Sequence, residues 1–126
     1  TYLEENEIDE QDLLIPMIDA RRMEVYTAVF DSQFNKIKQT QALILQNNSF
    51  DEFLSKSSCH FIGDGAEKSE LLFKGENTSF TPTTYPSAKV MAQCVEQAFI
   101  AQKFEDTAYF EPYYLKDFVD GKKNKN

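Results

Sequence analysis

The sequence predicts an α/β fold, with one mixed sheet in which three antiparallel strands precede alternating helices and strands. Three observations support this prediction. Residues 13–18 form a continuous apolar run, too short for a helix and typical of a strand buried on both faces. Residues 24–31 alternate with the period of two that a strand requires. After Pro86, apolar residues recur at three- and four-residue spacing, which indicates an amphipathic helix.

The first two strands should form an antiparallel hairpin joined by a short connection at residues 19–23. Pro16 has no N–H to donate, so that side of the first strand should be an edge or a bulge. Asp31, Ser32 and Gln33 supply the next turn. A third strand should occupy part of residues 34–45.

Shorter elements follow the three strands. Ser49 and Glu52 have the spacing of a capping box, which would open a short helix through residues 50–54. Residues 60–62 should be a short strand that ends at Gly63-Asp64-Gly65. A second short helix at residues 67–73 and a strand at residues 79–81 come next.

The long helix gives the strongest helical pattern in the chain. Pro86 suits its first turn, where the missing N–H costs nothing. Its apolar stripe consists of Met91, Cys94, Val95, Ala98 and Ala101. Residues 110–118 are aromatic and extended, because Pro112 excludes a helix interior. This last segment is either a strap that packs across the domain or part of a protein interface, where Tyr and Phe are common.

The element order is that of a ribonuclease-H-like lobe. The predicted organisation is an acidic lead-in at residues 1–12, a single ribonuclease-H-like lobe at residues 13–118, and a polar, basic tail at residues 119–126.

Composition limits the classes of function. The chain has 126 residues, with 13 Lys and Arg against 21 Asp and Glu and a net charge of −8. Nucleic-acid binders cluster cations against phosphates, whereas the basic cluster here is the tail Lys122, Lys123, Lys125, so direct nucleic-acid binding is not expected. The absence of an apolar stretch of about 18 residues argues against a membrane span. Cys59 and Cys94 should both be buried, reduced thiols of a cytoplasmic protein.

Three stretches resemble the TsaB/YeaZ family of glycoprotease-like proteins. They are Ile18-Asp19-Ala20-Arg21 followed by Glu24-Val25-Tyr26, then Pro86-Ser87-Ala88, and finally Glu111-Pro112-Tyr113-Tyr114-Leu115-Lys116. Arg22-Met23 replaces the family's more usual Met-Gly pair. Lys116 replaces an Arg, which keeps the charge but loses the planar fork, so a bidentate anion contact at this position is in doubt. The family's first half is absent, and the remainder resembles the second lobe of an actin-like ATPase fold.

The resemblance implies a non-catalytic scaffold or activator subunit. Such a protein partners a TsaD-like catalytic subunit and a TsaE-like ATPase in threonylcarbamoylation of the tRNA adenosine beside the anticodon. Formation of a homodimer is an alternative that the sequence does not decide. The resemblance implies no cofactor and no membrane partner. The family-motif positions are expected to be structural or to form an interface: Asp19, Arg21, Glu24, Tyr26, Pro112, Tyr114 and Leu115.

The alternatives are a ribonuclease-H-type or peptidase-like hydrolase, or an interaction module of unknown pathway. A two-metal nuclease would need carboxylates facing Asp19, and we interpret Asp19 as a turn residue or ion-pair partner. We expect His60 to be a core or half-buried side chain, since a metal site needs several converging ligands. Gly63 and Gly65 are weak candidates for a phosphate-binding loop, because Asp64 adds negative charge there.

Overall fold

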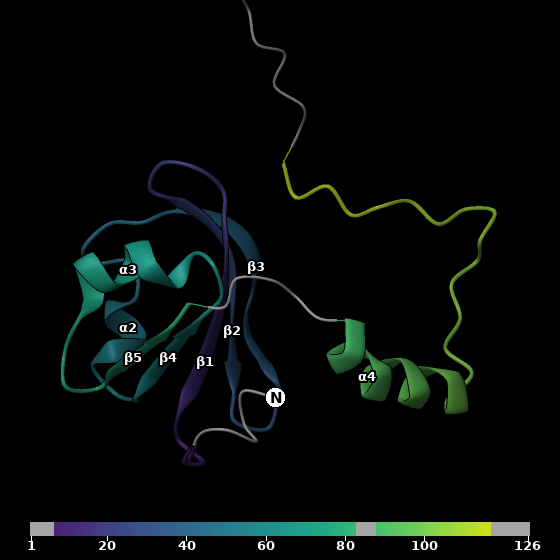
Figure 1. The fold of residues 1–126 in the computed structure, drawn as a ribbon, viewed down its shortest axis with the longest axis horizontal. Coiled ribbons are helices and arrows are strands. Elements are labelled where there is room, and N and C mark those ends of the chain that lie inside the picture. Colours follow the sequence, from purple (N-terminus) through teal and green to yellow (C-terminus); the bar gives the residue numbers. More distant parts are fainter. Residues whose placement is uncertain (1–6, 83–87, 117–126) are drawn as a thin grey trace, which may run out of the picture.

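The computed structural model describes residues 7–82 and 88–116 of the chain (Figure 1). Its elements follow in order: β1 Leu13–Asp19, β2 Glu24–Asp31, β3 Lys36–Ile44, α2 Asp51–Leu54, β4 Cys59–Ile62, α3 Ala66–Phe73, β5 Thr78–Thr81 and α4 Ala88–Ile100.

The five strands form one mixed sheet in the order β3-β2-β1-β4-β5. The pairs β1–β2 and β2–β3 are antiparallel, whereas β1–β4 and β4–β5 are parallel. α2 and α3 lie together beside the sheet, and α4 stands apart from the lobe (Figure 1). The predicted α/β class and the predicted order of strands and helices are confirmed.

Pro16 lies in the central strand of the sheet, so the predicted edge or bulge on β1 is wrong. The β1–β2 register is the same on both sides of it, from Leu14 opposite Phe30 to Met17 opposite Thr27. In this register the imide nitrogen of Pro16 faces Ala28, whose carbonyl oxygen accepts a bond from the hydroxyl of Thr27 at 3.4 Å. The Thr27 hydroxyl is thus a donor to this oxygen, to which proline cannot donate a ladder bond.

Aromatic rings fill the space between the sheet and the two short helices. Phe50 lies edge-on to both Phe61 and Phe73, with ring centroids 5.4 Å and 5.3 Å apart. Phe61 also stacks on Phe80 at 5.0 Å. Ile15 and Met17 of β1 complete the buried layer beneath these rings. Each such ring contributes roughly 1.5–3 kcal/mol by leaving water.

The capping box predicted at Ser49 and Glu52 is wrong. The Ser49 hydroxyl oxygen accepts the N–H of Gln46 at 2.9 Å, which closes the preceding turn and takes the oxygen away from the helix. Glu52 instead pairs with Lys38 of β3 at 2.6 Å. Helix α2 therefore begins at Asp51 with Phe50 at its N-cap and without a side-chain cap.

The apolar stripe of α4 is exposed. Met91 and Val95 of the predicted stripe are 61% and 56% accessible, and Phe99, outside that prediction, is 67% accessible. Cys94 is exposed as well, so the prediction of two buried thiols is confirmed for Cys59 and wrong for Cys94. Helical periodicity predicted the helix, but it could not say whether another surface covers the apolar residues. The rings of the following segment are also 60–84% accessible: Tyr109, Phe110, Tyr113 and Tyr114.

None of the helices within residues 7–82 and 88–116 has the length and apolar character that crossing a bilayer requires.

Candidate functional site: a charged cluster at the β1–β2 turn

The turn between β1 and β2 has an unusual backbone. Arg21 and Arg22 both have positive φ values, 71° and 50°. The N–H of Ala20 donates to the Glu24 carbonyl, and the N–H of Glu24 donates to the Arg21 carbonyl, each at 3.0 Å. A side chain in the left-handed region costs about 1–2 kcal/mol, so the turn needs support from its surroundings.

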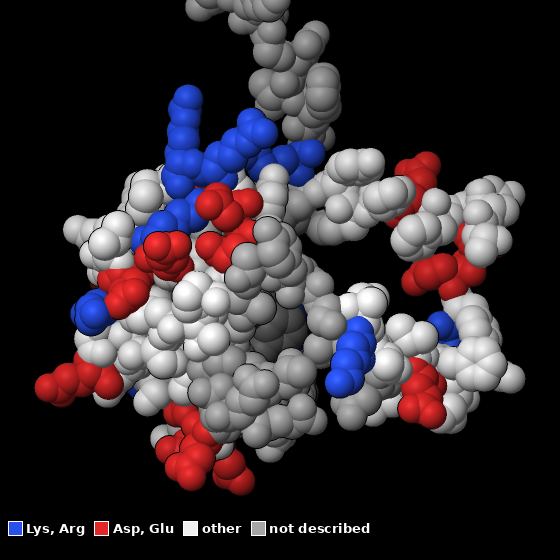
Figure 2. All heavy atoms as spheres, viewed as in Figure 1, with Lys and Arg blue, Asp and Glu red and all other residues white. Residues whose placement is uncertain are grey.

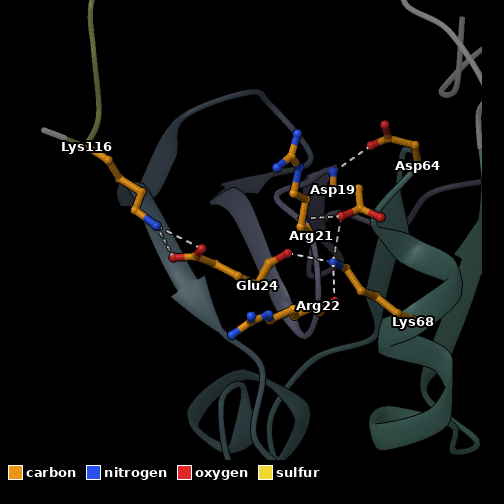
Figure 3. Close-up of polar contacts among 7 residues, drawn as sticks. All are labelled: Asp19, Arg21, Arg22, Glu24, Asp64, Lys68 and Lys116. Carbon is orange, nitrogen blue, oxygen red and sulfur yellow. Dashed lines mark hydrogen bonds and ion pairs between the residues drawn. The ribbon is translucent and has the colours of Figure 1, made fainter. Parts of the chain in front are cut away.

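Lys68 of α3 supplies that support. Its ammonium group donates to the Asp19 carboxylate at 2.8 Å, to the Arg22 carbonyl at 2.9 Å and to the Glu24 carbonyl at 2.6 Å (Figure 3). An ammonium group has three donors, and all three are used. The Lys68 side chain is only 14% accessible, which makes these bonds stronger than those of a freely solvated lysine. Lys68 therefore fixes the strained turn against α3.

Asp19 joins the turn to two neighbouring elements. Its carboxylate accepts from Lys68 and from the Arg21 N–H at 2.6 Å, and its own N–H donates to the Asp64 carboxylate at 2.8 Å. The bond from Lys68, followed by that from the Arg21 N–H, lowers the pKa of Asp19 below its ordinary value. Asp19 is thus an ionised turn residue and an ion-pair partner, and both of these bonds are accepted by its Oδ1.

Glu24 connects this turn to a segment 92 residues away. The Lys116 ammonium group lies 2.8 Å from both carboxylate oxygens of Glu24. The hydrogen bond that Lys116 donates to Glu24 is the main reason that the pKa of Lys116 is raised. The two-oxygen contact that the Arg-to-Lys replacement put in doubt is present, made by one nitrogen instead of two. The first and third family-like stretches therefore meet at this ion pair.

The guanidinium groups of Arg21 and Arg22 are the part of the cluster that stays available. Both residues are exposed, and their side chains point in different directions (Figure 3). Within the described part of the chain, neither guanidinium forms an ion pair, since the nearby Asp19 and Glu24 pair with lysines. Figure 2 shows basic and acidic side chains mixed over this end of the lobe. Such a surface suits a discrete anionic group better than a long polyanion.

Gly63 and Gly65 are explained by close packing against β1. Gly63 has φ +111°, and a Cβ there would lie 2.3 Å from the Met17 carbonyl oxygen. A Cβ on Gly65 would lie 2.9 Å from the Met17 side chain and 3.0 Å from that of Val25. The Gly65 N–H donates to the Met17 carbonyl at 3.3 Å, so it is already used within the fold. This turn lets α3 approach the sheet closely enough for Lys68 to reach the hairpin.

The remaining motif positions differ in burial. Tyr26 is half-buried on β2 opposite Ile18, and Leu115 is half-buried beside Lys116, whereas Pro112 and Tyr114 are exposed. The structure brings Asp19, Arg21 and Glu24 into one cluster. Sequence reasoning missed Lys68, for which the available signal was that it is the one basic residue in α3.

His60 is half-buried, as expected, and contacts Asp12 and Ser79. Among the described residues no group of three or more His, Cys, Asp or Glu side chains could hold a metal ion.

Comparisons with known proteins identify the fold. No family model matches the chain, and no curated protein matches it. A solved structure does match, that of an uncharacterized protein with similarity to peptidase YeaZ from Pseudomonas aeruginosa, with a TM-score of 0.59 at 16% sequence identity. The chain has a YeaZ-like fold. The match covers 82% of this chain, which spans about half (49%) of the length of that protein. The YeaZ-like fold agrees with the mixed five-stranded sheet of a ribonuclease-H-like, actin-like lobe.

Proposed function

We propose that the chain acts as a TsaB-like scaffold or activator in the cytoplasm. In this role it contacts a TsaD-like catalytic subunit, in cooperation with a TsaE-like ATPase, during threonylcarbamoylation of the tRNA adenosine beside the anticodon. Two kinds of support converge on the proposal: the YeaZ-like fold and the family-like sequence stretches.

The observation that carries the proposal is the meeting of the first and third stretches at the Glu24–Lys116 ion pair. Two segments that are distant in sequence are held together, and the neighbouring Arg21 and Arg22 are exposed. An arginine fork recognises carboxylates in two-bonded geometry, and arginine is enriched at protein interfaces. A contact surface for an acidic patch of a partner protein is therefore the role that this end of the lobe supports best.

A binding role also suits the chemistry of the cluster. Asp19 is the carboxylate that the nuclease hypothesis would use, and its Oδ1 accepts bonds from Lys68 and from the Arg21 N–H. We therefore assign threonylcarbamoyl transfer to the partner subunit and not to this chain.

Reconstitution tests the proposal. The purified chain is combined with a TsaD-like subunit, a TsaE-like ATPase, a threonylcarbamoyl donor and unmodified tRNA, and the modified nucleoside is measured by mass spectrometry. We expect modification to depend on the chain, which should co-elute with the TsaD-like subunit. Failure of both co-elution and modification would contradict the proposal.

A pair of double variants locates the contact. The double variant Arg21→Glu with Arg22→Glu should raise the dissociation constant for the TsaD-like subunit at least about tenfold and so reduce co-elution, as expected for interface arginines. Lys36→Glu with Lys56→Glu changes the net charge equally at exposed positions elsewhere and should leave co-elution unchanged. Equal weakening by both variants would mean that net charge alone drives the association.

Asp19→Asn tests the hydrolase alternative. If the wild-type chain cleaves RNA or peptide substrates and this variant does not, Asp19 is a catalytic residue and the interpretation of the β1–β2 turn as a contact surface is wrong.

A further inference from the structure

Asp12, His60 and Ser79 form a hydrogen-bonded chain away from the charged cluster. His60 Nε2 lies 3.0 Å from the Asp12 carboxylate, and His60 Nδ1 lies 2.7 Å from the Ser79 hydroxyl. The three residues come from the segment before β1, from β4 and from β5. Sequence reasoning found no nucleophile paired with a base, because these residues are 19 and 48 positions apart.

The sheet register sets this geometry. β4 and β5 pair in parallel with His60 directly opposite Ser79, and Leu14 of β1 lies opposite His60 on the other side. Side chains alternate between the faces of a strand, so His60 points away from the core that holds Cys59 and Phe61. The imidazole is therefore held between its neighbours on the face opposite α2 and α3.

The protonation pattern follows from the partners. A carboxylate can only accept, so the neutral imidazole carries its proton on Nε2 and donates it to Asp12. The lone pair of Nδ1 then faces the Ser79 hydroxyl and accepts a hydrogen bond from it. Asp12 is itself oriented by the Asp9 N–H at 3.0 Å, and the side chains of Asp12 and His60 are only 12% and 13% accessible. A nucleophile is thus hydrogen-bonded to a base, and the base is hydrogen-bonded to a group that orients it.

We propose that Ser79 is an acyl-accepting nucleophile, with His60 as its general base and Asp12 as the residue that positions His60. The Ser79 oxygen attacks the carbonyl carbon of an activated ester while its proton moves to His60 Nδ1. The ester C–O bond breaks, the alcohol leaves with that proton, and an acyl-Ser79 ester remains. Water, deprotonated by His60, then releases the carboxylic acid and restores the hydroxyl.

The surroundings limit the substrate class. An open polar hollow of about 580 Å³ adjoins this chain of residues at Asp12. Its lining includes the acidic residues Asp9, Glu10 and Asp12, a single lysine, Lys56, and Asn77, which lies two residues before Ser79 in the chain. Acidic walls disfavour anionic ligands. Small esters with a neutral or cationic acyl group are therefore the expected substrates. This activity is independent of the TsaB-like role, since it uses none of the residues at the β1–β2 turn.

A neutral fluorophosphonate reagent tests the proposal directly. Attack by Ser79 forms an O–P bond and expels fluoride while His60 takes the proton, so the intact mass should rise by one adduct. Peptide mapping of the labelled wild-type chain should place that adduct on Ser79, without relying on any variant to fold. No adduct, or adducts spread over other serines, would overturn the proposal.

Variants separate chemistry from packing. His60→Gln should slow labelling at least about 100-fold, the usual effect of removing a general base, and Asp12→Asn should slow it by a smaller factor. Ser32→Ala is the matched control, because the Ser32 hydroxyl donates to the Glu10 carbonyl and faces no base. Ser32→Ala should label at the wild-type rate. Labelling of folded His60→Gln at the wild-type rate would show that His60 is only a structural partner of Ser79, and hydrolysis of 4-nitrophenyl acetate by the same variants should follow the same order.

Discussion

The sheet lobe at residues 7–82 and the segment at residues 88–116 both carry aromatic side chains, but only the lobe buries them. Phe50 and Phe61 are fully buried between the sheet and the two short helices, whereas Phe99 and Tyr113 are 67% and 83% accessible. The side chains are similar, and the difference lies in whether a second apolar surface faces them. Hydrophobicity of a residue thus indicates what can be buried, and the tertiary contacts decide what is.

The largest test of this contrast compares one phenylalanine from each region. Phe61→Ala removes a ring that contacts three others and should lower the free energy of unfolding by about 3–5 kcal/mol. Phe99→Ala shortens an exposed side chain that contacts Phe104, and it should change the free energy of unfolding by less than about 1 kcal/mol. Urea unfolding followed by circular dichroism measures both values. A large loss with Phe99→Ala would mean that α4 is packed in solution.

The two cysteines report on the same contrast through their reactivity. Burial, followed by the charge of Asp12, raises the pKa of Cys59 to about 11, so only about one thiol in ten thousand is ionised at pH 7. Cys94 is exposed on α4. A thiol reagent such as dithionitrobenzoate should modify Cys94 at least about 100-fold faster than Cys59 in the folded protein. Cys59→Ser and Cys94→Ser assign the two phases, and similar rates for both thiols would contradict the contrast.

Local pattern predicted much of the lobe from sequence. Alternation located β2, the continuous apolar run located β1, and the Gly-Asp-Gly turn separated β4 from α3. These signals depend on neighbours within a few residues. The place of β4 beside β1, and not beside β3, depends on a crossover connection that local pattern does not specify.

The errors arose where a distant contact replaced a local one. Glu52 has the spacing of a capping residue but pairs with Lys38 of β3, and Pro16 lies in a central strand because β4 pairs with β1 on the side away from β2. Likewise the cluster at the β1–β2 turn could be located by its motif, but Lys68 could not, since the sequence does not specify which side of α3 faces the hairpin. The exposure of Cys94 could not be predicted from helical periodicity alone.

The tight packing of the lobe predicts different responses from two of its glycines. Gly63→Ala places a Cβ 2.3 Å from the Met17 carbonyl oxygen in a left-handed backbone, and should cost about 3 kcal/mol of unfolding free energy. Gly75→Ala is the control, because the nearest atom to its added Cβ is 3.9 Å away. It should be nearly neutral in the same urea titration. Equal effects would mean that the close approach of the β4–α3 turn to β1 is not maintained.

Lys68→Met should lower the unfolding free energy by about 1–2 kcal/mol at pH 7, since a mostly buried ammonium group loses three acceptors. The effect should depend on pH. Lys68 lowers the pKa of Asp19 in the folded protein below 3.8, so this contribution is present above about pH 4 and is lost as the pH falls through the lowered value. The difference in unfolding free energy between wild type and variant should therefore narrow as the pH falls below 3.8. Asp19→Asn in the Lys68→Met background should add little, because the two residues act through one contact.

The smallest effect is expected where the two regions meet. Lys116→Ala removes the ion pair with Glu24. Within the described chain, this ion pair is the hydrogen-bonded contact between residues 101–116 and the lobe. Exposed ion pairs add little to global stability, so the urea midpoint should stay within error of wild type. Amide hydrogen exchange in residues 110–116 should nevertheless become faster, because this end of the segment loses its attachment to β2. Lys103→Ala, at an exposed lysine of the same segment, should leave the exchange unchanged. Added salt should speed exchange in the wild-type chain but not in Lys116→Ala, since screening weakens only the ion pair that the variant has already lost.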